Sequence, residues 1–574
     1  MSPEPPVLVL DADGRAGLAC VQSLGRAGSV VHVGVRSVGS PTERSRWCRA
    51  VHAQPPSEPA ERGLDWLLDL DRQFSFSLVL PATEAALRWL CRLPDTHPLH
   101  EKAVLPSNAA LEAALDKEQT REIAVGLGIA VPASRLLPRG EAPPVAEGSF
   151  PKVLKPVRSK VVVGSRLMTL PVTVVRGGAE RAEILAAWLP FTAVQEQEWV
   201  PGRGFGVEML YDRGTMAWHF AHERLHESPL TGGASTWRRS CATDSELIEP
   251  SRRLLDRLGW HGVAMIEWRC SQGSAPQLIE INPRLWGSLP LTIAAGVDIP
   301  LGMLALARHT PLPAASAWRA GVRARNLTDD LQWFVDNARA DKRDPLLLTQ
   351  PVRRAALGWL SALSARESWD GWCLRDPKVA LGELADLVVG RTTSLGRRIS
   401  HHVAVARARR RHGRLCGAKT SADRQVSSVL FVCLGNICRS PFAAEAARSR
   451  LGGIAVASGG FHADEGRPSP RHVVETARTL AIDMSACRSV RLTPERVAAA
   501  DLILCMDVTN LRQLAIEYPS ALSRATLLGL FRPQGPAQIN DPFGLSPATT
   551  RMVFVQILDA LQSLSEWIAI APPV

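Results

Sequence analysis

One string of fourteen residues, Ser428 to Pro441 (SVLFVCLGNICRSP), constrains the fold of this chain more than any other stretch. Its apolar run, Val429 to Val432, is typical of a buried parallel strand, and Pro441 opens a segment rich in helix-forming residues. A short loop that begins at Cys433 lies between the two. The string therefore predicts a strand, a loop and a helix, with a cysteine at the point where the loop starts.

The residue types in this loop suit the binding of a phosphate group. Backbone N–H groups of a tight loop at a helix N-terminus form an anion-binding nest, and the same field favours a thiolate over a thiol. Cys433 is therefore a candidate nucleophile, and Arg439 can present a permanently charged fork to phosphoryl oxygens. Gly435 permits the turn, Asn436 can hold it by side-chain hydrogen bonds, and the Ser440 hydroxyl can point at the sulfur.

The string from Cys433 to Pro441 resembles the signature of the low-molecular-weight protein tyrosine phosphatases, and the resemblance extends from about Val426 to the C-terminus. The other matching stretches are Ala457–Gly460, Leu492–Pro494, Ala500–Leu504 with Met506–Asp507, and Asp541–Phe543. The resemblance implies a phosphocysteine on Cys433 and a general acid, Asp541, that protonates the leaving phenolate. It also implies that Cys438 traps an oxidised Cys433 as a disulfide, and that this domain needs no cofactor.

The substrate of the predicted phosphatase stays open. The tyrosines that often follow the Asp-Pro pair in this family are absent: Phe543 stands where the first is expected, and the whole chain contains only Tyr211 and Tyr518. We expect a phosphorylated protein or a similar small phosphate monoester. Arsenate reduction is an alternative, because a sister family performs it on the same scaffold. Its disulfide relay needs two further cysteines, and no cysteine follows Cys505.

The start of the chain has the pattern of a doubly wound α/β lobe. The strand pattern Val7–Leu10 is followed by a turn and an amphipathic run, and then by a second strand pattern, Val30–Gly34. Leu78–Glu84 repeats the strand-then-turn pattern. A lobe that ends near Ala110 is expected to bind any small ligand at the carboxyl ends of its strands. The full G-x-G-x-x-G fingerprint is absent, so a dinucleotide is not expected.

The next segment combines strand-borne lysines with strand-borne acids. Lys155 lies on the strand pattern Pro151–Pro156, and Val263–Glu267 and Leu278–Arg284 are strand patterns that carry carboxylates near their ends. Two such acids and an Asn form an oxygen-rich Mg²⁺ site, and lysines supply point charges for phosphates.

This constellation resembles the ATP-grasp superfamily, particularly its carboxylate–amine ligases, over about Val7 to Ala307. The resemblance implies ATP and Mg²⁺ as cofactors and a small carboxylate and an amine as substrates. The implied residues are Lys117 and Lys155 for the ATP phosphates, Gln197, Glu198, Trp199 and Val200 for the adenine, Glu267, Glu280 and Asn282 for Mg²⁺, and Arg284 for the acyl-phosphate. The family's glycine-rich loop is reduced to Gly164, so a non-catalytic ATP-sensing module that regulates the phosphatase stays as an alternative.

Charge is concentrated in one segment of the chain. The formal net charge is +11, and residues 391–424 contain ten lysines and arginines but a single acid, Asp423. Such a run is typical of a solvated linker, with a contact to an acidic protein or a membrane surface as the alternative. Specific nucleic-acid binding is not expected, because the rest of the chain is almost neutral.

The remaining patterns bear on the cellular location of the protein. The most apolar stretch, Pro290–Ala307, is interrupted by Asp298 and Pro300, and the N-terminus lacks the pattern of a signal peptide. The eleven cysteines are odd in number and scattered, which favours reduced thiols. These features predict a cytoplasmic protein.

The predicted fold class is α/β, with α+β lobes in the ATP-grasp domain. The predicted parts are an N-terminal lobe (1–110), an ATP-grasp domain (111–318), a helical extension with a basic linker (319–425) and a parallel-sheet phosphatase-like domain (426–574). The predicted protein is bifunctional, with phosphatase and ATP-dependent ligase activities.

Overall fold

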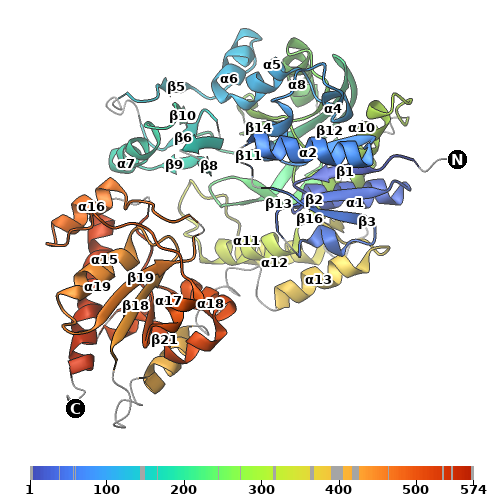
Figure 1. Ribbon diagram of the computed structural model, residues 1–574. Coiled ribbons are helices and arrows are strands. Elements are labelled where there is room, and N and C mark those ends of the chain that lie inside the picture. The colour runs from blue at the N-terminus through green and yellow to red at the C-terminus, as the bar shows by residue number, and fades with distance from the viewer. Residues whose placement is uncertain are drawn as a thin grey trace. The chain divides into compact units, whose positions relative to one another are not determined.

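The computed structural model describes residues 4–37, 39–55, 57, 60–141, 149–158, 160–163, 166–242, 245–271, 273–314, 318–361, 367–388, 405–415, 426–462, 464–532, 535–543 and 547–569. The chain divides into two compact units, Met1–Thr393 and Ser394–Val574. Figure 1 shows the elements of both units.

The first unit begins with a parallel four-stranded sheet. Its strand order is β3 (Cys48–Ala53), β2 (Val31–Val35), β1 (Val7–Leu10), β4 (Leu78–Pro81). Alternate residues of β1 enter different cores: Leu8 packs with Leu67 of α2 (Ala60–Phe74), and Val9 packs with Val21 of α1 (Arg15–Arg26). Side chains of a strand point to opposite faces in turn, so helices cover both faces. This is the predicted doubly wound lobe.

Short helices lead from this lobe to a small antiparallel sheet. They are η1 (Pro41–Arg44), α3 (Glu84–Leu90), α4 (Pro98–Lys102), α5 (Asn108–Leu115) and α6 (Lys117–Gly126). The sheet has the order β5 (Ser134–Leu137), β10 (Val194–Glu198), β6 (Lys152–Pro156), β9 (Thr173–Val175), and α7 (Gly178–Trp188) packs on it. A hairpin, β7 (Lys160–Val163) and β8 (Arg166–Thr169), follows β6 where the family's glycine-rich loop is expected. Gly164 lies outside the described residues.

A seven-stranded sheet forms the largest part of the first unit. Its order is β15 (Gln277–Asn282), β14 (Gly262–Cys270), β11 (Arg203–Asp212), β12 (Thr215–Ser228), β13 (Ala234–Ser240), β16 (Arg323–Arg325), β17 (Glu367–Trp369). The helices of this part are α8 (Ser245–Arg257), α9 (Leu289–Ala295), α10 (Ile299–Ala307), α11 (Leu327–Arg339), α12 (Val352–Leu360) and α13 (Pro377–Val388).

The extension after Arg319 was expected to be helical, but it also supplies β16 and β17 to this sheet. Each of these strands has only three residues, too few to show an alternating pattern. Arg325 holds them together, because its buried guanidinium pairs with Asp330 and, at 2.7 Å, with Glu367. Charge pairing rather than periodicity therefore builds this edge of the sheet.

The second unit contains a parallel four-stranded sheet in the order β19 (Ala455–Gly460), β18 (Ser428–Cys433), β20 (Leu502–Cys505), β21 (Ala525–Leu527). Its helices are α15 (Arg439–Arg448), α16 (Arg471–Arg478), α17 (Pro494–Ala498), α18 (Val508–Glu517), η4 (Pro519–Arg524), η5 (Leu528–Phe531) and α19 (Pro547–Ala569). Phe431 packs on one face with Phe442 and Phe554. Val432 packs on the other face with Leu511. The predicted parallel-sheet fold is confirmed.

Part of the predicted basic linker is described. Residues 405–415 are helical, and Ala408 is buried in the core of the second unit. The other residues of the basic run lie outside the described residues. Among the described residues, no single helix has the length and apolar composition needed to cross a membrane; α9 and α10 reach those limits only together, with a 91° bend between them.

Candidate functional site

Cys433 lies at the carboxyl end of the central strand β18, and α15 begins at Arg439. The loop between them turns back over the cysteine, so that the Asn436 N–H donates to the Cys433 Sγ at 3.2 Å. The Ser440 hydroxyl lies 3.0 Å from the same sulfur. Both neighbours can donate hydrogen bonds to a thiolate, which stabilises its negative charge.

Asn436 shapes this loop. Its backbone has φ of +50°, a left-handed conformation that Asn tolerates better than most residues. Its side-chain amide donates to the hydroxyls of Ser440 at 2.9 Å and Ser458 at 3.0 Å, and its carbonyl oxygen accepts the Val490 N–H at 2.8 Å. The predicted role of Asn436 in holding the loop matches these contacts.

The guanidinium of Arg439 is almost fully buried and spread between two carboxylates. One of its terminal nitrogens, Nη1, donates to Asp507 at 2.7 Å and to the Ile539 carbonyl at 2.9 Å. The other, Nη2, donates to Asp541 at 2.8 Å. Sequence reasoning assigned no role to Asp507, which caps the N-terminus of α18. An Asp directly after a buried strand is the signal that might have been used.

Asp541 is the more accessible of the two carboxylates, with 43% of its side chain exposed against 21% for Asp507. Two apolar side chains near the loop and near Asp541 also face solvent: Leu434 is 48% exposed and Phe543 is 52% exposed. Exposed apolar side chains beside this loop favour a bound molecule with an apolar or aromatic body.

Cys438 is buried at the N-cap position of α15, in the same core as Cys433. Burial, and then the charge of Asp541, raise the pKa of the Cys438 thiol well above its usual value. Cys438 is therefore a neutral thiol at physiological pH. Its predicted redox role stays a prediction.

Arg467 is a residue that sequence reasoning missed. Its Nη2 donates to the Gly435 carbonyl at 2.8 Å. The Gly435 carbonyl and the Asn436 N–H belong to one trans peptide, so they point to opposite sides of it. By holding the carbonyl, Arg467 directs the N–H toward Cys433.

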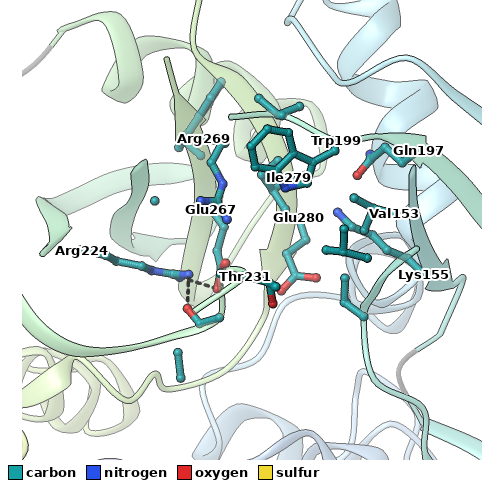
Figure 2. Close-up of a pocket in the computed structure, with 18 of the residues that line it drawn as sticks. Val153, Lys155, Gln197, Trp199, Arg224, Thr231, Glu267, Arg269, Ile279 and Glu280 are labelled. Atoms are coloured by element: carbon teal, nitrogen blue, oxygen red, sulfur yellow. Dashed lines mark hydrogen bonds and ion pairs between the residues drawn. The ribbon is translucent and has the colours of Figure 1, made fainter. Parts of the chain in front are cut away.

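The first unit contains a cavity of about 350 Å³, here called the hinge cavity, and all the predicted ATP-binding residues except Lys117 line it. Figure 2 shows Lys155 and Gln197 on one side of it, facing Glu280, with Glu267 and Arg224 beyond. Lys155 comes from β6, and the predicted adenine-binding residues Gln197 to Val200 lie at the end of β10 and just after it. Glu198 also pairs with Lys152 at 2.5 Å.

The two predicted metal-binding carboxylates are direct neighbours, because Glu267 of β14 and Glu280 of β15 are register partners. The Asn282 amide nitrogen donates to Glu267 at 3.0 Å and to Glu280 at 3.3 Å. Its oxygen accepts from Arg284 at 3.1 Å. The two carboxylates suit Mg²⁺, but Asn282 would need to rotate its amide to become a ligand. Among the described residues no group of three His, Cys, Asp or Glu forms a metal cluster.

Cations balance this acidic pair. Lys117 lies 3.2 Å from Glu280, and Arg224 lies 2.8 Å from Glu267. Burial alone would raise the pKa of Glu280, but Lys117 and Lys155 outweigh it and lower that pKa to about 2. Burial lowers the pKa of Lys155 to about 8. The site therefore holds ionised carboxylates and two lysines within one small volume.

A second cavity of about 700 Å³, here called the strand-end cavity, adjoins the hinge cavity. It lies where β1, β2 and β4 end, which is the predicted ligand position of the doubly wound lobe. Glu267, Arg224 and Arg284 line both cavities. A ligand in the second cavity can therefore approach the same carboxylates and arginines.

Comparison with protein families gives two matches. Residues 428–570 match the family model described as low molecular weight phosphotyrosine protein phosphatase. Residues 196–330 match the model described as ATP-grasp in the biosynthetic pathway with Ter operon. Both resemblances inferred from the sequence are confirmed by these matches.

Two individual phosphatases and one solved ligase structure are among the proteins similar to this chain. The chain is 38% identical over 104 residues to EpsP of Ralstonia nicotianae, a probable low molecular weight protein-tyrosine-phosphatase, with 18% of this chain and 72% of that protein covered. It is 30% identical over 146 residues to the low molecular weight protein-tyrosine-phosphatase Etp of Escherichia coli, with 25% and 95% covered. A solved L-amino acid ligase from Bacillus licheniformis matches with a TM-score of 0.43 and 18% identity, covering 54% of this chain and 75% of that chain.

The Arg467 contact predicts a measurable change in thiol reactivity. Replacing Arg467 by Gln should slow alkylation of Cys433 by iodoacetamide at pH 6 by about 10-fold, because a hydrogen bond to a charged group contributes about 1.5–3 kcal/mol. Alkylation is followed by mass spectrometry of the Cys433 peptide. Arg471→Gln is the matched control, since Arg471 pairs only with Glu475 of its own helix in the described structure. Equal rates for Arg467→Gln and wild type would show that the Asn436 N–H points at Cys433 without help from Arg467.

Proposed function

We propose that this chain, which belongs to the low molecular weight protein-tyrosine-phosphatase family through residues 428–570, hydrolyses phosphate monoesters in its second unit through a phosphocysteine. The loop at Cys433 is the observation that supports this most strongly. Its sulfur lies within hydrogen-bond distance of the Asn436 N–H and the Ser440 hydroxyl, and the loop leads directly into the buried cation Arg439.

In the proposed reaction the Cys433 sulfur attacks the phosphorus atom, and the bond between phosphorus and the ester oxygen breaks. Asp541 gives its proton to the departing oxygen. A water molecule then attacks the phosphocysteine, Asp541 takes a proton from that water, and inorganic phosphate leaves with the thiolate restored. Ser440 stabilises the sulfur in both steps, because its hydroxyl lies at hydrogen-bond distance.

Arg439 is proposed to couple substrate binding to the release of Asp541. Without substrate, its Nη2 donates to Asp541 at 2.8 Å. When substrate binds, two phosphoryl oxygens can accept hydrogen bonds from the guanidinium together, and this paired arrangement is more favourable than the single bond to Asp541. Asp507 and the Ile539 carbonyl keep Nη1 in place meanwhile. Asp541 then becomes available for proton transfer.

The proposed substrate is an aryl phosphate such as phosphotyrosine, because Leu434 and Phe543 expose apolar surface beside the loop and Asp541. A small phosphate monoester is the second candidate. Arsenate reduction has less support, because Cys505 is fully buried on β20 and burial raises the pKa of its thiol.

For the first unit we propose Mg²⁺-dependent ATP binding in the hinge cavity and ligase chemistry through an acyl-phosphate. Lys155, which lines this cavity, and Lys117, which pairs with Glu280, would hold phosphate oxygens, and the register partners Glu267 and Glu280 would hold the metal. Mg²⁺, when held by these carboxylates, would supply positive charge that neutralises the phosphates. Arg284 lines both cavities, so it can face a carboxylate substrate that enters from the strand-end cavity.

A sensing role without turnover is the second candidate for this unit. The β7–β8 hairpin follows Lys155 in place of a glycine-rich loop. A hairpin offers fewer free backbone N–H groups to phosphates than a glycine-rich loop does. Formation of ADP in the presence of a carboxylate and an amine would exclude the sensing role.

The phosphatase proposal predicts the behaviour of two variants. Cys433→Ser should lower the hydrolysis of an aryl phosphate by more than ~1,000-fold, since no other group supplies the nucleophile. Asp541→Asn should lower kcat by roughly 10²- to 10⁴-fold, and most for esters with poor leaving groups. Rates are measured by release of the phenol. Full activity of Cys433→Ser would refute the mechanism.

The ATP proposal predicts a metal-specific defect. Glu280→Gln should weaken ATP binding in Mg²⁺ by at least ~10-fold. Without metal it should not weaken binding, because the change frees Lys117 from its pair with Glu280. Calorimetry on the full chain measures both affinities. Glu249→Gln is the control, as Glu249 is an exposed acid on α8 that pairs with Arg252. Equal losses with and without Mg²⁺ would contradict a metal-binding role.

The redox proposal for Cys438 predicts a difference in recovery. After mild peroxide treatment, wild type should regain its starting activity with a dithiol, because a Cys433–Cys438 disulfide prevents over-oxidation. Cys438→Ser should regain only a small fraction of its own starting activity. Cys487→Ser, a partly buried cysteine in the same unit, should recover like wild type. Full recovery of activity by Cys438→Ser would show that Cys438 only fills space in the core.

A further inference from the structure

The first unit contains a third cavity, of about 650 Å³, that neither proposed activity uses. Five arginines line it, and we call it the arginine cavity: Arg203, Arg224, Arg239, Arg323 and Arg354. Arg224 also lines the hinge and strand-end cavities, whereas the other four line neither. The arginine cavity is therefore a separate space that adjoins the proposed ATP site at one residue.

Most of the cavity lies on the other face of the seven-stranded sheet from Glu267. Arg239 pairs in register with Glu223 of β12 and with Arg323 of β16, so these three residues share a face. The neighbouring residue Arg224 alternates to the opposite face, where it reaches Glu267. A ligand in the arginine cavity would not occupy the hinge cavity.

The acids near this cavity are already engaged. Glu223 is shared by Arg203 and Arg239, the latter at 2.5 Å. Glu227 accepts the backbone N–H groups of Gly204 and Gly233, each at 3.1 Å. The two remaining arginines, Arg323 and Arg354, therefore find no free carboxylate among these acids.

Arg323 and Arg354 are the unbalanced cations. The Arg323 guanidinium lies 5.7 Å from the centre of the Trp237 ring, and its buried Nε has no hydrogen-bond partner within the described part of the chain. Arg354 is exposed and has no carboxylate within ion-pair distance among the described residues. A buried N–H without an acceptor is costly unless a ligand supplies one.

The start of α12 adds to this positive field. Gln350, Pro351 and Arg354 line the cavity, and α12 begins at Val352. The first turn of the helix contains two arginines and no acid. Free N–H groups and the helix dipole make a helix N-terminus positive, so arginines there are unfavourable unless an anion binds among them.

Part of the wall is apolar. Leu225, Trp237, Leu348 and Leu357 line the cavity beside the arginines. A volume of about 650 Å³ lies in the range that small organic ligands occupy. The ligand should therefore combine carbon atoms with its negative groups.

We propose that the arginine cavity binds a small organic anion with at least two negatively charged groups, one of them a phosphate. The phosphate accepts from the Arg354 fork and the N–H groups at the start of α12, as fork and helix terminus both match phosphate geometry. The second group accepts from Arg323, which supplies the partner that its Nε lacks. The carbon part of the ligand contacts Trp237.

The test uses 3-phosphoglycerate, which carries a phosphate and a carboxylate, as the probe. Calorimetry is performed on the full chain in an Arg439→Ala background with a saturating non-hydrolysable ATP analogue and Mg²⁺, so that the other two phosphate sites are disabled or filled. One binding event is expected, and glycerate, which lacks the phosphate, should bind at least ~10-fold more weakly.

Arg354→Gln and Arg323→Gln should each weaken binding of 3-phosphoglycerate by about 10-fold, and both together should abolish it. Arg72→Gln is the matched control, as Arg72 is an exposed arginine paired with Asp69 on its own helix α2. Arg354→Gln should also leave the melting temperature unchanged or higher without ligand, which separates loss of the site from misfolding. Absence of binding in the background protein, or equal affinity in the double variant, would overturn the proposal.

Discussion

The burial of one charged group, the Arg439 guanidinium, sets the arrangement of the second unit's site. A buried cation is tolerated only with partners, and removing one partner of such a pair is strongly destabilising. Here the partners come from two segments far along the chain: Asp507 at the start of α18, and Asp541 with the Ile539 carbonyl. Because Arg439 needs all three hydrogen-bond acceptors, its burial brings the loop at Cys433 and the loop that carries Asp541 together.

The first unit uses the same physical device in its extension. Arg325 is fully buried between Asp330 and Glu367, and Asp330 also contacts His226 of β12 at 2.7 Å. Arg238 of β13 is buried against Asp370, just after β17. These charges lie in an interior where an unpaired member would be very costly. They therefore fix the register of two strands that are too short to be specified by hydrophobic packing.

Positively charged side chains appear at the proposed sites of both units, but their degree of neutralisation differs. At the proposed ATP site Lys117 and Arg224 each pair with a carboxylate that lines the hinge cavity, so a phosphate that binds either cation must displace an existing pair. At Arg439 both terminal nitrogens are occupied, one by a carboxylate that substrate can replace. In the arginine cavity Arg323 and Arg354 have no such partner in the described structure. A ligand at Arg323 and Arg354 therefore displaces no existing ion pair of the described structure.

What the sequence determined by itself is local. The groups from Cys433 to Ser440 lie on one loop, so their mutual geometry follows from a strand, a turn and a helix start, and a short string suffices to predict them. The continuous burial of β1 and β18 follows in the same way from their apolar runs, and the strand-borne acids Glu267 and Glu280 follow from their positions on β14 and β15.

Tertiary structure alone decided the contacts that cross long separations. Arg467 on Gly435, Asp507 on Arg439 and Lys117 on Glu280 join residues that lie far apart in the sequence. The orientation of the Asn282 amide and the pairing of strands β16 and β17 also depend on contacts between distant residues. Each depends on pairing energy between groups that meet only after folding, and pairing of that kind leaves no periodic trace in the sequence.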